Sequence, residues 1–286
     1  MRWDFHKHKT YMECPKKHKL EFDRVPPTKQ DNKYFAVRGT IIQKFFELYA
    51  NGHYPPGLEL NRAGVSKFLK YYYDRELTYS FVDWKSHMSK LSRTELFDEI
   101  VDIVLENLKR LDIYRDGTRS EVKIVVKLKN GDELVGKLDF IKNYADGSKA
   151  IIDGKATATM GKNVDLDQLL FYAWLEKINS GVLPDKLGFL YYALQEEDWK
   201  RFDKTDVETA VRKILYSLEC AKKDTTFLPT PSAPACKYCS YLDTCVEGRA
   251  DMGSRKRGSR TAATDTGVVR VGNEENGFIR FDRGLK

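Results

Sequence analysis

The sequence has no long run of apolar residues. Hydrophobic residues make up 41% and charged residues 32% of its 286 positions, and no stretch approaches the roughly 18 apolar residues of a membrane span. The basic beginning of the chain, MRWDFHKHKTYMEC, also lacks the apolar segment of a secretion signal. We therefore expect a soluble cytoplasmic protein with no membrane partner.

Nucleotide-binding loops and internal repeats are also missing. The sequence contains neither a Walker-type loop nor a GxGxxG pattern, so nothing supports a motor or dinucleotide function. Lysine and arginine outnumber aspartate and glutamate by 49 to 42, and this net charge of +7 is compatible with a polyanion partner without proving one. A chain of this length can form one main domain with a smaller appendage.

Cysteine is scarce and unevenly placed, at Cys14, Cys220, Cys236, Cys239 and Cys245. In a reducing compartment this pattern favours metal ligation over disulfides. The three thiols of the last cluster could share one centre with Cys14, whereas we assign Cys220 to packing and regard His18 as a substitute ligand. Four thiolates suit either tetrahedral Zn²⁺ or a [4Fe–4S] cluster, and spacing alone does not choose between them.

Hydrophobic periodicity predicts helices over residues 39–50 and after a capping box at Ser92–Glu95, and a helical insertion over residues 58–118. From residue 121 a period of two predicts a hairpin with its turn at residues 130–132, followed by a strand over 149–155. A helix over 165–179, ended by Gly181, and a strand over 187–194 complete the pattern. This order predicts a mixed α/β sheet flanked by helices.

The composition changes near the end of the chain. Residues 248–260 hold five basic residues against one acidic residue, and the stretch that follows has no clear periodicity. We expect a domain over residues 1–246 and a flexible basic tail over 247–286. Within this tail, Arg255, Lys256 and Arg257 either contact phosphates or belong to a solvated segment.

Three charged residues interrupt the predicted strands. Asp153 and Lys155 project to one face because side chains alternate along a strand, and Asp139 can meet them from the neighbouring strand. Taken one by one, each residue is more often structural. Together, two carboxylates beside an ammonium suit Mg²⁺ or Mn²⁺ and the hydrolysis of phosphate esters. The next helix carries Gln168 and Tyr172 one turn apart.

These motifs resemble the PD-(D/E)XK nuclease superfamily, and specifically its RecB-like branch, whose motifs are an Asp, a D/E-x-K and a Q-x-x-x-Y. The matching residues here are Asp139, Asp153-Gly-Lys155 and Gln168-Leu-Leu-Phe-Tyr172. The resemblance implies that Asp139 and Asp153 hold the metal, with the Gly154 carbonyl as a further ligand, and that Lys155 serves the attacking water. It also implies that Gln168 and Tyr172 face the active site and the DNA backbone.

The sequence departs from this branch at one position. Where the branch often has G-T-x-x-H on its first helix, this chain has Gly39-Thr-Ile-Ile-Gln43. Gln43 offers a weaker oxygen ligand, or water takes that place. The departure bears on the number and affinity of the metal ions more than on the reaction.

The cysteines extend the resemblance. A set of three close cysteines (Cys236, Cys239 and Cys245) with a distant Cys14 is similar to the iron–sulfur nucleases related to AddB and to the CRISPR-associated RecB-like exonucleases. We therefore expect a restriction-endonuclease-like α/β core with an iron–sulfur clasp that joins the two ends of the domain. The cluster would be a structural staple, since hydrolysis needs no redox step.

The leading hypothesis is a Mg²⁺- or Mn²⁺-dependent DNA exonuclease that acts on single strands or free DNA ends. Its activity would serve recombination, repair or degradation of DNA, and we expect a partner protein in a recombination or repair complex. One alternative is a catalytically impaired DNA-binding module of the same fold, in which Gln43 marks lost activity; the intact carboxylates and Lys155 argue against it. A zinc-stapled structural protein would leave the acidic pair unexplained. Cleavage polarity, strand preference and oligomeric state stay open.

Overall fold

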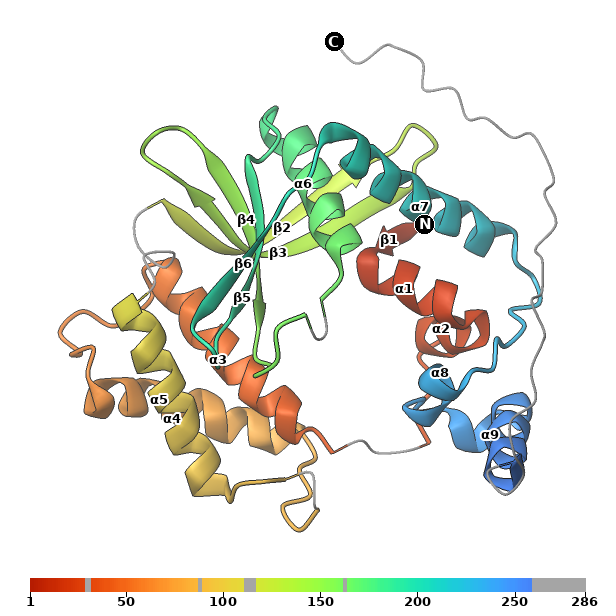
Figure 1. Cartoon of the computed structure of the whole chain (residues 1–286), viewed down its shortest axis with the longest axis horizontal. Helices are drawn as coiled ribbons and strands as arrows, with labels where there is room; N and C mark the ends of the chain where they lie inside the picture. The colour runs from red at the N-terminus through yellow and green to blue at the C-terminus, as the bar shows by residue number, and fades with distance from the viewer. Residues whose placement is uncertain (29–31, 87–88, 111–116, 162–163, 259–286) are drawn as a thin grey trace.

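The computed structural model describes residues 1–28, 32–86, 89–110, 117–161 and 164–258 (Figure 1). The strands are β1 (Arg2–Asp4), β2 (Thr118–Lys127), β3 (Glu133–Asn143), β4 (Lys149–Lys155), β5 (Lys186–Tyr191) and β6 (Glu196–Lys200). The helices are α1 (Phe5–Glu13), α2 (Pro15–Phe22), α3 (Tyr34–Ala50), α4 (Arg62–Tyr79), α5 (Arg93–Arg110), α6 (Leu166–Ser180), α7 (Lys204–Lys223), α8 (Ala233–Lys237), the short 3₁₀ helix η2 (Leu242–Thr244) and α9 (Val246–Gly258). In this part of the chain, no helix combines the length and apolar character needed to cross a membrane.

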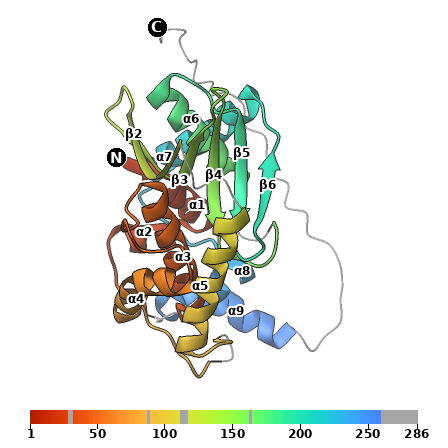
Figure 2. The same cartoon turned by 90° about the vertical axis from the view of Figure 1, so that its left-hand side faces the viewer.

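The strands form one mixed sheet, in which β2, β3, β4, β5 and β6 lie side by side (Figure 2). β2 and β3 are antiparallel, as are β3 with β4 and β5 with β6, whereas β4 and β5 run parallel. A parallel pair needs a crossover connection, and α6 provides it between β4 and β5. The predicted mixed α/β sheet flanked by helices is therefore confirmed.

Two hydrophobic clusters lie on opposite faces of the sheet. One cluster joins α1, α6 and α7 to residues such as Ile151 and Phe189. The other joins α3, α4 and α5 to Phe140, Ile152 and Leu190. Neighbouring residues of β4 therefore enter different clusters, as the two-residue alternation of a strand requires.

One edge of β3 pairs with a single strand, and its other edge pairs with two. β2 pairs with β3 along most of its length. On the opposite edge, β1 pairs in parallel with Glu133–Val135, and β4 pairs in antiparallel fashion with Phe140–Asn143. Residues 136–139 lie between these two ladders, so among the described strands none pairs with them on this edge. The sheet is thus open at one point, next to Asp139.

Most predicted elements occur near their expected positions. The capping box is present, because the Ser92 amide donates to Glu95 Oε2 (2.8 Å) and the Glu95 amide donates to Ser92 Oγ (3.3 Å). Gly181 ends α6 in the left-handed region at φ 79°, which glycine adopts without steric cost. The strand predicted over 187–194 is shorter, because β5 ends at Tyr191 and the chain turns.

The first part of the predicted flexible basic tail over 247–286 lies in a helix. Residues Val246–Gly258 form α9, which follows Cys245 directly and packs beside α8 and η2. The Arg249 amide donates to the Cys245 carbonyl over 3.0 Å and continues the helical pattern. Residues 259–286 lie outside the described part.

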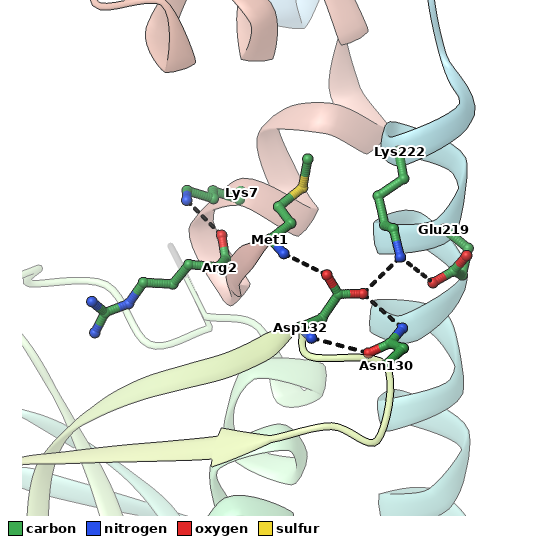
Figure 3. Close-up of polar contacts among 7 residues, drawn as sticks. All are labelled: Met1, Arg2, Lys7, Asn130, Asp132, Glu219 and Lys222. Carbon is green, nitrogen blue, oxygen red and sulfur yellow. Dashed lines mark hydrogen bonds and ion pairs between the residues drawn. The ribbon is translucent and has the colours of Figure 1, made fainter.

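A buried carboxylate fixes the beginning of the chain to the sheet (Figure 3). Asp132, in the hairpin turn, accepts from the Met1 amino group (2.5 Å) and from Lys222 Nζ of α7 (2.7 Å). Asn130 holds the same carboxylate through its side-chain amide (2.7 Å). The Asp132 side chain is only 4% exposed, so these contacts replace the hydration that it has lost.

We predict that Asp132→Asn lowers the melting temperature at pH 7 and that the difference from wild type shrinks in acid. Hydrogen bonds from Lys222 and the amino group lower the pKa of Asp132 below its ordinary value of 3.8. A lowered carboxyl pKa stabilises the fold above the unfolded-state pKa, and this stabilisation is lost as the pH falls through the folded-state pKa. Thermal unfolding at pH 7 and near pH 3 measures the effect. An equal difference at both pH values would contradict it.

Candidate active site

The open point of the sheet brings two carboxylates together. The ladder between β3 and β4 ends at the pair Phe140–Ile152, so Asp139 and Asp153 occupy the next two facing positions, where the strands separate. Beyond this point β4 stays paired only with β5 in the described sheet. The backbone amide of Gly154 donates to Asp139 Oδ2 over 2.9 Å, which holds this carboxylate in the fork between the strands.

Lys155 completes the acidic pair. Its Nζ lies 2.5 Å from Asp153 Oδ2, and both side chains are largely buried, at 17% and 6% exposed. The ammonium also lies over the Phe189 ring at 5.8 Å from the centroid, which favours a cation. The predicted convergence of Asp139, Asp153 and Lys155 is therefore present in the structure.

Burial makes the ionised forms of both carboxylates less favourable than in water. Burial, reinforced by the negative charge of Asp153, raises the pKa of Asp139 to about 7. Burial also raises the pKa of Asp153, although Lys155 opposes the shift. Two carboxylates that cannot both ionise easily are typical of sites that hold a cation or share a proton.

α6 places Gln168 and Tyr172 against this pair. Gln168 Nε2 donates to the Tyr172 hydroxyl over 3.1 Å, so the two side chains act as one unit. Burial, with smaller contributions from the charges of Asp153 and Asp139, raises the pKa of Tyr172 to about 12. The helix can approach because Gly136 has no side chain, and an added Cβ would lie 3.1 Å from the Tyr172 ring.

Gln43 reaches the site from α3 on the other face of the sheet. Its Oε1 accepts a hydrogen bond from the hydroxyl of Tyr192, and its Nε2 donates to Glu121 Oε1 at 3.5 Å. A Cβ at Gly154 would lie 2.7 Å from Gln43 Oε1 and would clash with Tyr192. The residue between Asp153 and Lys155 must therefore be glycine for this arrangement to form.

Two residues of this surrounding shell were missed by the sequence analysis. Tyr192 directly follows β5, and only the fold brings its hydroxyl to Gln43. Glu121 faces Asp139 across the hairpin but interrupts the ladder, because it adopts the left-handed region at φ 58°. Its carboxylate pairs with Lys137 and is 14% exposed. A glutamate in this backbone conformation is strained, and such strain concentrates at functional sites.

Comparison with known proteins now assigns a family. The model of the PD-(D/E)XK nuclease superfamily matches residues 2–246, which is most of the chain. The chain belongs to this superfamily. No curated protein gives a significant match.

Two solved structures are similar to this PD-(D/E)XK chain. One is a protein of Eubacterium rectale named as a candidate exonuclease, at 12% identity and a TM-score of 0.49, with 93% of this chain and 91% of that one covered. The other is the protein SSO0001, at 15% identity and a TM-score of 0.34, with 82% and 95% covered. At these scores the likeness carries no argument about function.

Four cysteines of this PD-(D/E)XK chain gather around one small cavity. Cys14 lies between α1 and α2, and it lines a cavity of about 30 Å³ together with Cys236, Cys239 and Cys245. The Gly248 amide donates to Cys245 Sγ over 3.4 Å, the kind of contact that supports a thiolate ligand. Chain segments more than two hundred residues apart in sequence therefore meet at these thiols.

His18 does not line this cavity, and its role as a substitute ligand stays a prediction. Its ring is buried among aromatic side chains, with the Trp3 centroid at 5.1 Å and a stacked Phe227 at 6.4 Å. Cys220 packs against the hydrophobic core and likewise does not line the cavity.

Neither the acidic pair nor the four cysteines have the arrangement of a complete metal site in the described residues. Across the described ranges, no group of three or more histidine, cysteine, aspartate or glutamate side chains has ligand geometry. The basic run Arg255, Lys256 and Arg257 falls in the last turns of α9, and its side chains lie outside the described part of the structure. Its role in DNA binding stays a prediction.

Proposed function

We propose that this PD-(D/E)XK protein is a metal-dependent DNA exonuclease of the RecB-like branch. The observation that carries this proposal is the fork between β3 and β4, which sets Asp139, Asp153 and Lys155 side by side in a largely buried site. The substrate that we propose is DNA with free ends or single strands, as in recombination, repair or degradation, with a partner protein in such a complex.

Lys155, Tyr172 and Gln168 have different roles in the proposed hydrolysis of the phosphodiester bond. A water oxygen attacks phosphorus, one P–O bond of the backbone breaks, and the leaving oxygen takes a proton. Lys155, held by Asp153, orients this water and balances negative charge that develops on the phosphate. Tyr172 and Gln168 donate hydrogen bonds toward the phosphate backbone from α6.

The donor set fits a hard divalent cation. Asp139, Asp153 and the Gly154 carbonyl would hold Mg²⁺ or Mn²⁺, which prefer oxygen ligands, and a bound cation would favour the ionised forms of the two carboxylates, whose pKa values burial raises. Gln43 Oε1 already accepts from Tyr192, so we assign it a weaker role at most as a ligand. When bound, the metal supplies charge neutralisation at the reacting phosphate.

We further propose that the four cysteines hold a structural [4Fe–4S] cluster, with Zn²⁺ as the alternative. Four thiols around one cavity fit either group chemically. The cavity that they line has a volume of about 30 Å³. Both groups would tie α1 and α2 to α8 and η2.

A nuclease assay tests the proposed function. Purified protein is incubated with linear and circular DNA, single- and double-stranded, with Mg²⁺, Mn²⁺ or EDTA. The proposal expects metal-dependent loss of linear DNA and survival of circles. Binding of DNA without any cleavage would instead favour the catalytically impaired binding module, in which Gln43 fails to replace histidine.

We predict that metal binding tightens with pH and releases protons. Without metal, the pKa of Asp139 is about 7, so this carboxyl is protonated below that pH and a cation must displace the proton. Affinity for Mn²⁺ should fall by about tenfold per pH unit below pH 7 and level off above it. Titration calorimetry in two buffers of different ionisation enthalpy counts the protons. The Asp139→Asn variant should bind more weakly and release fewer protons than wild type; proton-free binding by wild type at pH 6 would refute the prediction.

A further inference from the structure

A groove of about 630 Å³ opens beside Lys155. It is lined by residues 155–159, which include the end of β4, by the beginning of α3 with Phe35 and Arg38, and by Lys90, Leu91 and Glu99. Lys155 lines the groove and also pairs with Asp153, so the groove adjoins the acidic site. A ligand that lies in the groove is therefore next to the candidate active site.

We propose that this groove binds one strand of DNA, with a base stacked on Phe35, and that it guides the strand to the acidic site. This inference rests on the proposed nuclease function and names the part of the surface that selects its substrate. The volume lies in the range of pockets that hold small ligands, so the groove has space for a nucleotide-sized part of one strand.

Phe35 has the properties of a stacking platform. Its side chain is 47% exposed although an aromatic ring of this size gains from burial. The ring is held from behind by Tyr34, which is buried and packs edge-on at 5.1 Å, and Tyr34 in turn packs edge-on against Trp84 at 6.1 Å. A ring fixed in this way can stack on a base with little loss of side-chain entropy, and stacking accepts any base.

The charges of the groove match a phosphate backbone. Lys90 is exposed in the lining, and Lys155 is the lysine that the groove shares with the acidic site. Arg38 is 12% exposed, and its charge is balanced by Glu99, a further lining residue, at 3.0 Å; Arg38 also donates to the Ala156 carbonyl at 3.3 Å. A cationic groove with an aromatic platform is the usual construction of sites that bind single strands without sequence preference.

The test measures binding of fluorescent oligothymidine by anisotropy, in EDTA so that metal-dependent cleavage cannot interfere. Phe35→Ala should weaken binding by about 5- to 100-fold, and Phe35→Trp should restore it. Lys90→Gln should reduce the slope of log affinity against log salt by about 0.7. The matched control is Tyr216→Ala, because Tyr216 is an aromatic residue that is 65% exposed but lies on α7; its affinity should stay at the wild-type value.

A second ligand separates stacking from general loss of affinity. On an abasic deoxyribose-phosphate polymer, wild type and Phe35→Ala should bind equally, since no base is present to stack. Affinity of Phe35→Ala for oligothymidine within twofold of wild type, or an equal loss on the abasic polymer, would overturn the inference. Cleavage by wild type with Mn²⁺ is measured separately. If wild type cleaves DNA but Phe35→Ala binds oligothymidine as tightly as wild type, only this inference fails. If Phe35→Ala binds more weakly but wild type does not cleave, only the nuclease proposal fails.

Discussion

Asp153→Ala and Lys155→Ala should each reduce DNA cleavage by about a thousandfold or more while DNA binding in EDTA persists. Asp153 is one of two carboxylates that would hold the metal, and Lys155 is the cation in contact with it at 2.5 Å. Each substitution removes an interaction that matters mainly when charge develops on the phosphate. Initial rates with Mg²⁺ and Mn²⁺ provide the measurement, and cleavage within tenfold of wild type in either variant would exclude the assigned role.

The edge strand β6 of the same sheet offers a matched control. Asp198 and Lys200 on β6 have the same two-residue spacing, form an ion pair at 2.7 Å, and place the Lys200 ammonium 6.0 Å from the same Phe189 ring. This pair lies on β6, the last strand of the order, so neither residue belongs to β3 or β4, which form the fork. Asp198→Ala and Lys200→Ala should therefore leave cleavage within about twofold, because a partly exposed ion pair contributes little to the fold.

Asp153→Asn adds a stability test of the same site. Because burial raises the pKa of Asp153, its ionised form destabilises the metal-free fold above the ordinary carboxyl pKa, increasingly as the pH rises. The Asn variant lacks this penalty, so without metal at pH 8 it should unfold at a temperature equal to or above that of wild type. A marked loss of stability would indicate a structural role for Asp153.

The second large effect is expected at the cysteine clasp, where Cys14→Ser should remove the bound metal group and much of the stability together. Tying residue 14 to residue 236 closes a loop of more than two hundred residues, a constraint worth about 5 kcal/mol by loop-closure scaling. Metal binding adds to the folding free energy, because the unfolded chain has no preformed site. Cys220→Ser is the control and should keep both properties, since Cys220 packs in the core.

Anaerobic purification decides which group is bound. Wild type should be brown with about four irons per chain, as a tetrathiolate cluster requires, and Cys14→Ser should be pale and prone to aggregation. A colourless wild-type protein with one zinc per chain would refute the iron–sulfur cluster and support Zn²⁺ as the bound group. A fully loaded and equally stable Cys14→Ser protein would remove the clasp itself.

The sequence reveals those parts of the fold whose signals are local. The hairpin and the capping box each occupy a few neighbouring residues, and the structure contains both. β1 has only three residues and acquires its identity by pairing with residues 133–135. β6 is largely polar, so it resembles a loop. In contrast, α7 has a local signal in the sequence, because it carries a capping box at Asp203–Asp206 and a regular apolar face. The sequence analysis did not predict this helix.

The same distinction holds for the site. Asp153 and Lys155 can be recognised from their spacing, because alternation along a strand is a local rule. Glu121 cannot be recognised in this way, since its left-handed backbone conformation depends on the surrounding sheet. Tyr192 reaches Gln43 across 149 positions of sequence. The residues that orient the site are therefore set by tertiary contacts, which local patterns do not contain.

The position of Trp3 has a consequence for synthesis of the protein. This side chain is fully buried, and its ring nitrogen donates to Ser217 Oγ, 214 positions later in the chain. At ribosomal rates, roughly 10 to 40 s pass between the appearance of these two residues. During this time the segment around Trp3 lacks its final neighbours, because α7 does not yet exist. This segment can therefore complete its packing only after α7 has been made, and a chaperone that shields it should raise the yield of native protein.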